Sequence, residues 1–409
     1  MKDPLEEASV DVDRRGATFS LIIVLVGLVV LAIVHPSARD ALVIIVGIIL
    51  MVMLHEAGHY FTAKRAGMKV TEFFLGFGPR LWSFKRGETE YGVKAIPAGG
   101  YVRIIGMSNL EEVDPADEPR TFRNASNKHR LTVILAGVTV NALLAFVLFA
   151  VAIAGRGQIP DGGANTHIGT IVKHSAAAKA GFKPGDRVTS VNGKRVHTWD
   201  QLKHAIESHG GHASTFTVLR HGKTVQLVAT PKRQHGQGFL GVGDPTATFR
   251  NVSILGSVPE SFRLMGDVTT GTFDVFANLF SPSGVANYSQ NFTSSPAKGL
   301  PSAGNDRPRS IIGIVDLGSQ IVHGDVWVLL FLLGNISLAF ALINLIPLLP
   351  FDGGHAAVVV YEMIASKVKR RKVQVDYRRL MPVAAVVLVL FMMLGLSAMF
   401  LDIKQAVGS

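Results

Sequence analysis

The stretch ALVIIVGIILMVMLHEAGHYFTAKR, Ala41 to Arg65, combines a long apolar run with ionisable side chains near its end. A membrane-spanning helix needs about 20 apolar residues, and this run supplies most of them. A helix that begins near Asp40 reaches His55 after roughly 22 Å, at 1.5 Å per residue. Because the hydrocarbon core is about 30 Å thick, we expect His55, Glu56 and His59 to lie within the membrane.

The composition of the whole chain indicates a membrane protein with a soluble part. Of its 409 residues, 48% are hydrophobic and only 17% are charged, whereas about 25% are charged in ordinary soluble domains. The absence of cysteine excludes disulfides and thiolate metal sites. The net charge of +11 fits the basic cytoplasmic loops of a membrane protein. No nucleic-acid partner is expected, because no nucleic-acid-binding motif accompanies the charge.

Hydropathy predicts a polytopic α-helical membrane protein with about five spans. The spans are expected at 17–34, 40–65, 131–155, 326–366 and 381–402, and prolines at positions 347 and 350 interrupt the fourth. Arginines precede the first span, and the loop 367–380 is basic. The positive-inside rule places both on the cytoplasmic side.

The remaining segments are expected to be soluble or to lie at the membrane surface. They are a cytoplasmic tail (1–16), a cytoplasmic β-rich membrane-associated region (66–130), an extracytoplasmic mixed α+β region (156–235) and an extracytoplasmic linker (236–325). Within the linker, Ser257 to Phe280 is expected to form an amphipathic helix, either on the outer membrane surface or in solution. The Ser/Pro/Gly-rich stretch Ser281 to Arg309 is expected to be a loop.

His55, Glu56 and His59 form the pattern H-E-x-x-H. On a helix, residues i and i+4 share one face, so both imidazoles can reach one metal ion. The glutamate between them is placed to take a proton from the attacking water. In a chain of this composition the pattern arises by chance only about 0.01 times. Ionisable groups within a span are costly, which favours a functional site over polar residues that merely mark a helix end.

A third metal ligand is predicted in the interrupted span, within NLIPLLPFDGGH, Asn344 to His355. Asp352 is the only acidic residue between Trp327 and Tyr361, and catalytic zinc usually has three protein ligands. Non-helical backbone at membrane depth is tolerated where it is buried or lines a cavity, so the break, the aspartate and the histidines can meet at one depth. Two alternatives remain: Asp352 as a helix cap, and His355 as a rival ligand rather than a structural residue.

Three motifs in this order, HEAGH, GFGPRLWSFKRGETEYGVKAIPAGGYVRIIGM and NLIPLLPFDGG, resemble those of the bacterial site-2 proteases. These are intramembrane zinc metalloproteases, and the resemblance is greatest to actinobacterial members with a single PDZ domain. It implies one Zn²⁺ per chain, held by His55, His59 and Asp352, with Glu56 as general base. It also implies that Asn344 holds or polarises the substrate backbone.

The same resemblance implies roles for the two soluble regions. Glu90 to Met107 is similar to the family's membrane-dipping β-hairpin, which pairs with unwound substrate; a purely structural flap is the alternative. The hairpin residues expected to bind substrate are Tyr91, Gly92, Val93, Gly99, Gly100 and Tyr101. The outer region 156–235 is similar to a PDZ domain, most of all in AGFKPGDRVTSVNG, Ala180 to Gly193. Such a domain either excludes substrates with large outer parts or binds a newly cut carboxyl end.

Two departures from the family pattern stand out. The third span usually carries A-G-P-x-x-N, but Val138 replaces the proline between Gly137 and Asn141. The first span, 17–34, has no counterpart in four-helix members.

The implied function is cleavage of single-pass membrane proteins, such as anti-sigma factors already cut by another protease, in regulated intramembrane proteolysis. The location would be the bacterial plasma membrane, in contact with lipid, with a cytoplasmic amino terminus and an extracytoplasmic PDZ-like domain. A scaffold without activity and a divalent-metal transporter are the rival hypotheses. The intact ligand set disfavours the scaffold, and the scarcity of ionisable groups in the other spans disfavours the transporter.

Overall fold

A computed structural model of the chain describes residues 32, 34–157, 166–172, 175–220, 222–234, 237–243, 252–293, 308–322 and 324–408. The expected tail and nearly all of the expected first span lie outside these residues. Among the described residues, four helices are long and apolar enough to cross a membrane: Ala38–Arg65, Asn127–Arg156, Val326–Asn344 and Tyr377–Lys404. Three of them correspond to the second, third and fifth expected spans, and Val326–Asn344 corresponds to the first part of the fourth, expected at 326–366.

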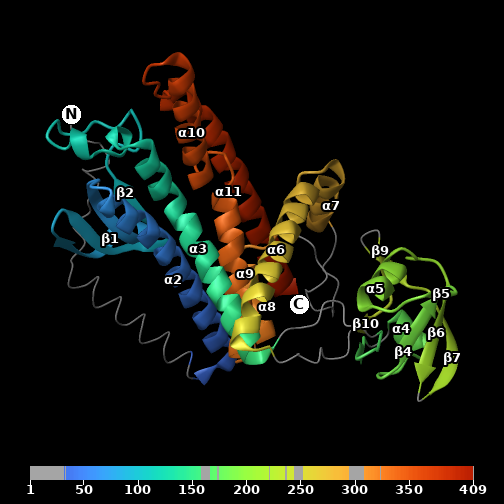
Figure 1. Cartoon of the computed structure of the whole chain (residues 1–409). Helices are drawn as coiled ribbons and strands as arrows, with labels where there is room; N and C mark the ends of the chain where they lie inside the picture. The colour runs from blue at the N-terminus through green and yellow to red at the C-terminus, as the bar shows by residue number, and fades with distance from the viewer. Residues whose placement is uncertain are drawn as a thin grey trace. The chain divides into compact units, whose positions relative to one another are not determined.

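The chain divides into two compact units, one formed by Met1–Ala152 with Ser261–Ser409 and the other by Ile153–Glu260. The long helices belong wholly or mainly to the first unit (Figure 1). They are α2 (Pro36–Arg65), α3 (Asn127–Arg156), α6 (Ile254–Leu279), α7 (Pro282–Thr293), α8 (Ile311–Val322), α9 (Val326–Asn344), α10 (Asp352–Lys369) and α11 (Tyr377–Gly408).

The expected interruption of the fourth span is present between α9 and α10. The side chain of Asp325 caps the start of α9 by accepting hydrogen bonds from the backbone N–H groups of Trp327 and Val328. Residues 345–351 are not helical, because the prolines within them cannot donate helical hydrogen bonds. The helix resumes as α10 at Asp352, so this carboxylate lies at the edge of the break.

The β-rich region expected at 66–130 contains two long strands, β1 (Val70–Arg86) and β2 (Thr89–Ile104). Residues 72–75 pair with 90–93 on one side and with 100–103 on the other, while 82–86 pair with 89–93. The two strands therefore bend into four segments in the order 82–86, 89–93, 72–75, 100–103. Among the described residues, the segment 100–103 has a strand neighbour on one side only.

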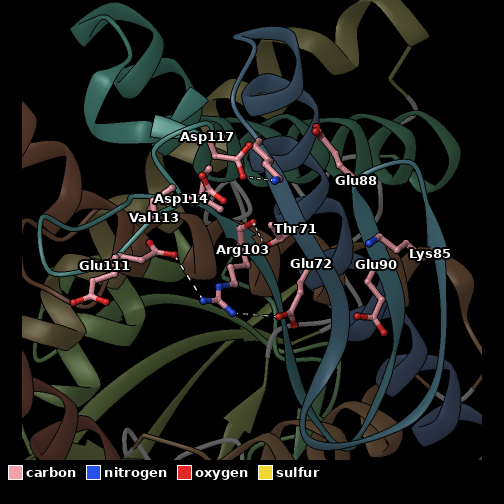
Figure 2. A pocket seen from close by; sticks show the side chains of 13 residues that line it. Thr71, Glu72, Lys85, Glu88, Glu90, Arg103, Glu111, Val113, Asp114 and Asp117 are labelled. Carbon is pink, nitrogen blue, oxygen red and sulfur yellow. Dashed lines mark hydrogen bonds and ion pairs between the residues drawn. The ribbon is translucent and has the colours of Figure 1, made fainter. Parts of the chain in front are cut away.

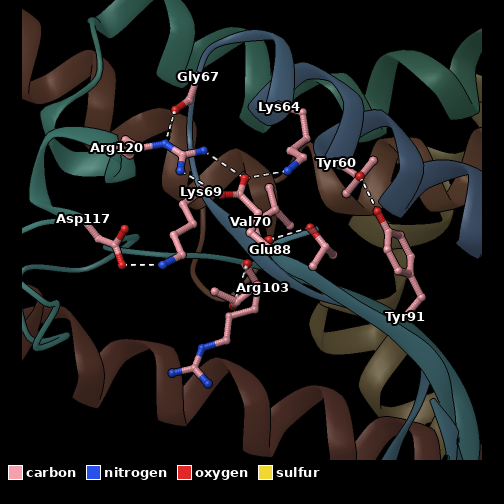
Figure 3. Close-up of polar contacts among 12 residues, drawn as sticks. Tyr60, Lys64, Gly67, Lys69, Val70, Glu88, Tyr91, Arg103, Asp117 and Arg120 are labelled. Atoms are coloured by element: carbon pink, nitrogen blue, oxygen red, sulfur yellow. Dashed lines mark hydrogen bonds and ion pairs between the residues drawn. The ribbon is translucent and has the colours of Figure 1, made fainter. Parts of the chain in front are cut away.

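A charged network attaches the turn of this hairpin to the end of α2 (Figure 3). The Glu88 carboxylate contacts the Lys64 ammonium at 2.6 Å and accepts two hydrogen bonds from the Arg120 guanidinium, at 2.7 and 2.9 Å. Hydrogen bonding to Arg120, followed by that to Lys64, lowers the pKa of Glu88 to about 2. The hydroxyls of Tyr60 and Tyr91 add a second connection at 2.5 Å. The hairpin is thus anchored to the helix that carries H-E-x-x-H.

The second unit is an α+β domain consistent with a PDZ-like domain. Its elements are β3 (Thr170–Ile171), α4 (Ala176–Ala180), β4 (Arg187–Val191), β5 (Lys194–Arg195), α5 (Trp199–Glu207), β6 (Ser214–Arg220), β7 (Lys223–Ala229), β8 (Lys232–Gln234), β9 (Gln237–Phe239) and β10 (Val242–Gly243). The largest sheet has the order β5-β4-β6-β7. Asn192 and Gly193 both have positive φ, at 49° and 78°, as required by the tight turn between β4 and β5.

This domain continues beyond the end expected at residue 235. Strand β10 pairs with β3, with Val242 opposite Ile171, and Leu240 is buried in the domain core with Phe216 and Leu202. The short strands β8 to β10 have too few residues to show an alternating pattern, so their sequence does not reveal the domain boundary.

The linker also contains more helix than its composition suggests. The start of the expected loop forms α7, and the hydroxyls of Tyr288 on this helix and Ser397 on α11 lie 2.8 Å apart. On α6, Met265 and Val268 pack against a buried cluster that includes Phe149 of α3 and Leu338 of α9. Part of the apolar surface of α6 therefore contacts other helices of the first unit, while Phe262 and Phe273 remain exposed. The local sequence does not show these partners of α6 and α7.

Candidate metal centre

Three ligand atoms converge where α2 meets the start of α10. The Nε2 atoms of His55 and His59 lie 3.2 Å apart. The Oδ2 atom of Asp352 lies 3.2 Å from the first nitrogen and 3.3 Å from the second. Among the described residues, these three form the one group of His, Asp or Glu side chains close enough to share a metal ion.

The spacing of these atoms fits zinc. With Zn–N and Zn–O bonds of about 2.0–2.2 Å, the ligand atoms of a tetrahedral site lie about 3.3 Å apart, close to the observed separations. The cluster lacks thiolates and consists of two imidazoles and one carboxylate, a set typical of catalytic zinc with one position open. His55, His59 and Asp352 are therefore suited to hold Zn²⁺.

Close packing against α3 holds the two imidazoles in place. His59 Nδ1 lies 2.7 Å from the backbone carbonyl oxygen of Val133, an outer contact typical of metal-bound histidine. Gly137 leaves room for both rings: a Cβ at this position would lie 2.5 Å from His59 Nε2 and 2.6 Å from His55 Nε2. The ring of Phe340 on α9 closes the other side of His55, with centroids 5.2 Å apart.

Glycines also position the carboxylate. A Cβ on Gly353 would lie 2.2 Å from the carbonyl oxygen of Leu345, and one on Gly354 would lie 2.4 Å from Leu348. Only glycine allows the non-helical segment to fold back this closely onto α10. Asp352 is the first residue of α10, and Phe351 takes the capping position without a side-chain hydrogen bond. The carboxylate points to the histidines instead.

His355 lies outside the convergent group. Its Nδ1 atom is 3.4 Å from the hydroxyl of Tyr377 on α11, and the two rings stack.

The expected general base, Glu56, lies beside the hairpin. A Cβ on Gly100 would be 3.1 Å from Glu56 Cγ and 3.0 Å from Met53 Sδ, so the strand edge at Gly100 packs directly on α2. This contact brings the free edge of segment 100–103 next to the residue expected to move the proton.

The six expected hairpin residues fall into two groups. Tyr91, Gly92 and Val93 lie inside the sheet with strand neighbours on both sides, whereas Gly100 and Tyr101 lie in the edge segment and Gly99 directly precedes it. The Tyr101 hydroxyl donates to Glu72, and burial together with this bond raises the pKa of Tyr101. Tyr101 therefore stays neutral at physiological pH.

Asn344, the expected substrate-binding amide, is the last residue of α9. Its Nδ2 atom donates to the backbone carbonyl of Phe340 at 3.0 Å. This bond uses one of the two hydrogens on the amide nitrogen, so the second remains a possible donor.

A charged cavity of about 410 Å³ lies on the hairpin (Figure 2), and none of the candidate metal ligands lines it. It is lined by Glu72, Glu88, Glu90, Glu111, Glu112, Asp114 and Asp117, together with Lys69, Lys85 and Arg103. Arg103 contacts Glu72 at 3.5 Å and Glu111 at 3.7 Å, and Lys69 pairs with Asp117. These pairs connect the sheet to the segment before α3, so the cavity belongs to the scaffold that holds the hairpin.

Sequence reasoning did not assign roles to Gly137 and Val133. A sequence signal for Gly137 exists, because this chain keeps the glycine of the A-G-P-x-x-N pattern even though it lacks the proline. The Val133 contact uses a backbone carbonyl, and no side-chain pattern reports it.

Comparisons with known proteins identify the family of the chain. The model of Peptidase family M50 matches residues 43–391. The chain is 34% identical over 387 residues to zinc metalloprotease Rip1 of Mycobacterium tuberculosis, covering 85% of this chain and 93% of that protein. It is 30% identical over 378 residues to Rip1 of Mycolicibacterium smegmatis, covering 82% and 90%. It is 28% identical over 356 residues to metalloprotease MmpA of Caulobacter vibrioides, covering 79% and 86%.

The expectations of a site-2 protease relationship with actinobacterial relatives, of zinc metalloprotease activity and of zinc as cofactor are thereby confirmed. The apolar helices and the family together show a membrane protein. The chain belongs to peptidase family M50, the site-2 protease family of membrane-embedded zinc metalloproteases.

Proposed function

We propose that this chain cleaves single-pass membrane proteins within or near the bilayer, in regulated intramembrane proteolysis of substrates such as anti-sigma factors already cut by another protease. One observation carries the proposal. A zinc-type ligand set, a glutamate and a strand edge with one strand neighbour meet where α2, a helix apolar enough to cross a membrane, approaches the start of α10.

In this proposal His55, His59 and Asp352 hold the metal, and Glu56 is the general base. When bound, zinc supplies Lewis acidity to the scissile carbonyl and to the attacking water. Glu56 accepts a proton from that water and delivers it to the leaving nitrogen. Asn344 keeps its bond to Phe340 and donates the second hydrogen of its amide nitrogen to the substrate carbonyl, which orients the peptide bond for attack.

The hairpin edge accounts for how a helical substrate can be cut. A membrane helix must be unwound around the peptide bond before that bond can be cut. Unwinding leaves backbone groups without hydrogen bonds, and each such group in lipid costs several kcal/mol. The edge segment at Gly99, Gly100 and Tyr101 offers main-chain partners to an extended substrate by strand addition. Tyr91, Gly92 and Val93 support this edge from inside the sheet.

For topology we propose the five spans expected from the sequence, including 17–34, in the bacterial plasma membrane. The amino terminus then lies in the cytoplasm and the PDZ-like domain outside. The basic loop 367–380 supports this orientation, because short basic loops stay on the cytoplasmic side. The exposed apolar side chains of α11 supply a surface for lipid.

The experiment is cleavage of a purified single-pass substrate whose span carries helix-destabilising residues, by wild type and Glu56→Gln in parallel, with zinc measured in both. Cleavage by wild type alone, with zinc retained in both, supports the proposal and assigns Glu56 to chemistry. Absence of zinc from the purified wild type and failure to bind added zinc would sink the proposed site and favour the scaffold hypothesis.

A further inference from the structure

Two buried side chains near the metal site have polar atoms without protein partners. They are Nδ1 of His55 and both the oxygen and the nitrogen of the Asn141 amide, none of which has a hydrogen-bond partner among the described residues. Asn141 is 0% exposed and His55 is 3% exposed. Buried polar side-chain atoms are nearly always hydrogen-bonded to protein or to ordered water. These atoms therefore require an explanation.

Helix geometry places Asn141 directly beyond the His55 ring. Gly137 touches that ring, since a Cβ there would lie 2.6 Å from both its Cε1 and its Nε2 atoms. Asn141 follows four residues later on the same face of α3, about 6 Å along the axis. Side chains on a helix lean toward its amino terminus. The Asn141 amide therefore leans toward Gly137 and the imidazole that covers it.

Helix α9 supports the same placement from the opposite side. Phe340 packs against the His55 ring. One turn earlier on α9, the hydroxyl of the fully buried Ser337 donates to the backbone carbonyl of Asn141 at 2.9 Å. Asn141 and Ser337 thus form a polar pair one helical turn from the Gly137–Phe340 pair that encloses His55.

A histidine that binds metal through Nε2 has an N–H donor on Nδ1 that needs a partner. When Nε2 binds a metal, the proton of the neutral imidazole lies on Nδ1, which then needs an acceptor. For His59 that acceptor is the Val133 carbonyl. For His55 the described residues offer none within hydrogen-bonding distance, while the Asn141 amide has an unused acceptor one turn away.

We propose that Asn141 is the positioning residue for His55, acting through one bridging water. The water accepts a hydrogen bond from the Nδ1–H group of His55 and donates hydrogen bonds to the Asn141 amide oxygen and to the Ser337 hydroxyl oxygen. Three polar partners are typical of a buried water. The inference rests on the proposed role of His55 as a zinc ligand. Helix α3 then orients both histidines, one through a carbonyl and the other through Asn141.

The test uses the full chain in lipid nanodiscs and compares Asn141→Leu with Asn335→Leu. Both changes remove an amide from a membrane helix, but Asn335 bonds within its own helix, to Phe331 at 2.7 Å. Zinc affinity is measured by competition with a chromophoric chelator, and the Co²⁺-substituted proteins give visible spectra. The expected result is an about 10- to 100-fold loss of zinc affinity with an altered Co²⁺ spectrum for Asn141→Leu, and wild-type behaviour for Asn335→Leu.

Equal zinc affinity and equal Co²⁺ spectra for Asn141→Leu and wild type would overturn the inference. If Asn141→Leu does not fold, Asn141→Asp is the deciding variant, because its side chain keeps a hydrogen-bond acceptor. Zinc affinity near that of wild type supports the role of Asn141. A loss of zinc affinity as large as that expected for Asn141→Leu contradicts it. A wild type that binds no zinc would instead refute the proposed ligand set, so the two failures are distinguishable.

Discussion

Replacing Gly137 by alanine should remove zinc while leaving the helices intact. The new Cβ would lie 2.5 Å from His59 Nε2 and 2.6 Å from His55 Nε2, whereas ordinary contacts begin near 3.4 Å. The rings must therefore retreat by about 0.9 Å (3.4 − 2.5), several times the roughly 0.2 Å by which zinc–ligand distances vary. We expect zinc affinity to fall by at least about 100-fold, since changes that merely disturb outer contacts cost 10- to 100-fold.

The backbone effect of this substitution has the opposite sign. Alanine is about 1 kcal/mol more favourable than glycine inside a helix, so the metal-free variant should remain folded. The matched control is Gly395→Ala on α11, where a Cβ would meet nothing within 4 Å. Zinc is quantified by chelator competition, helix content by circular dichroism, and activity by cleavage of a single-pass substrate.

Zinc binding by Gly137→Ala within about threefold of wild type would contradict the expected clash with the imidazoles. A similar loss in Gly395→Ala would show that the effect is not local to the imidazoles.

Further predictions concern the strand edge, the two ion pairs and the metal. Gly100→Val should lower kcat/KM for a membrane substrate at least tenfold, because its side chain would press on Glu56, and zinc content should stay at the wild-type level. Arg220→Ala should destabilise the PDZ-like domain by about 3 kcal/mol, because the Asp186 side chain is 1% exposed and loses its ion-pair partner at 2.7 Å. Hydrogen exchange on the full chain measures this loss. Burial alone would raise the pKa of Asp186, but hydrogen bonds from Arg220 and a backbone N–H lower it, so the stabilisation should be complete above the unfolded pKa of about 3.9 and be lost below it. The Glu88 pKa of about 2 likewise predicts that hairpin protection against exchange falls as pH drops below about 4.3 toward 2 in wild type. The fall should be smaller in Arg120→Ala, where Glu88 keeps only its contact with Lys64. Dialysis against a chelator should abolish cleavage, and added Zn²⁺ should restore it; activity that survives complete zinc removal would contradict the metal-dependent mechanism.

Local sequence determined the parts of this protein that depend on neighbours along the chain. The four-residue spacing of His55 and His59 places both rings on one helix face. The two prolines after Asn344 interrupt the helix whatever other segments pack around it. The glycine-rich segment around Asp352 permits a close turn at that break. For these reasons the candidate metal ligands could be named from the sequence, and their resemblance to a family supported the assignment.

Other features depend on which segments meet in space, and only the tertiary structure decided them. Sequence shows that 90–104 forms strands, but not that Tyr91 lies inside the sheet while Gly100 lies at its free edge beside Glu56, because strand order is set by pairing between distant residues. The same holds for α7, whose partner is on α11. Gly137 and Asn141 belong to the A-G-P-x-x-N pattern, but that pattern does not show what they contact. They acquire their roles because α3 packs against the imidazoles of α2, a contact between distant segments.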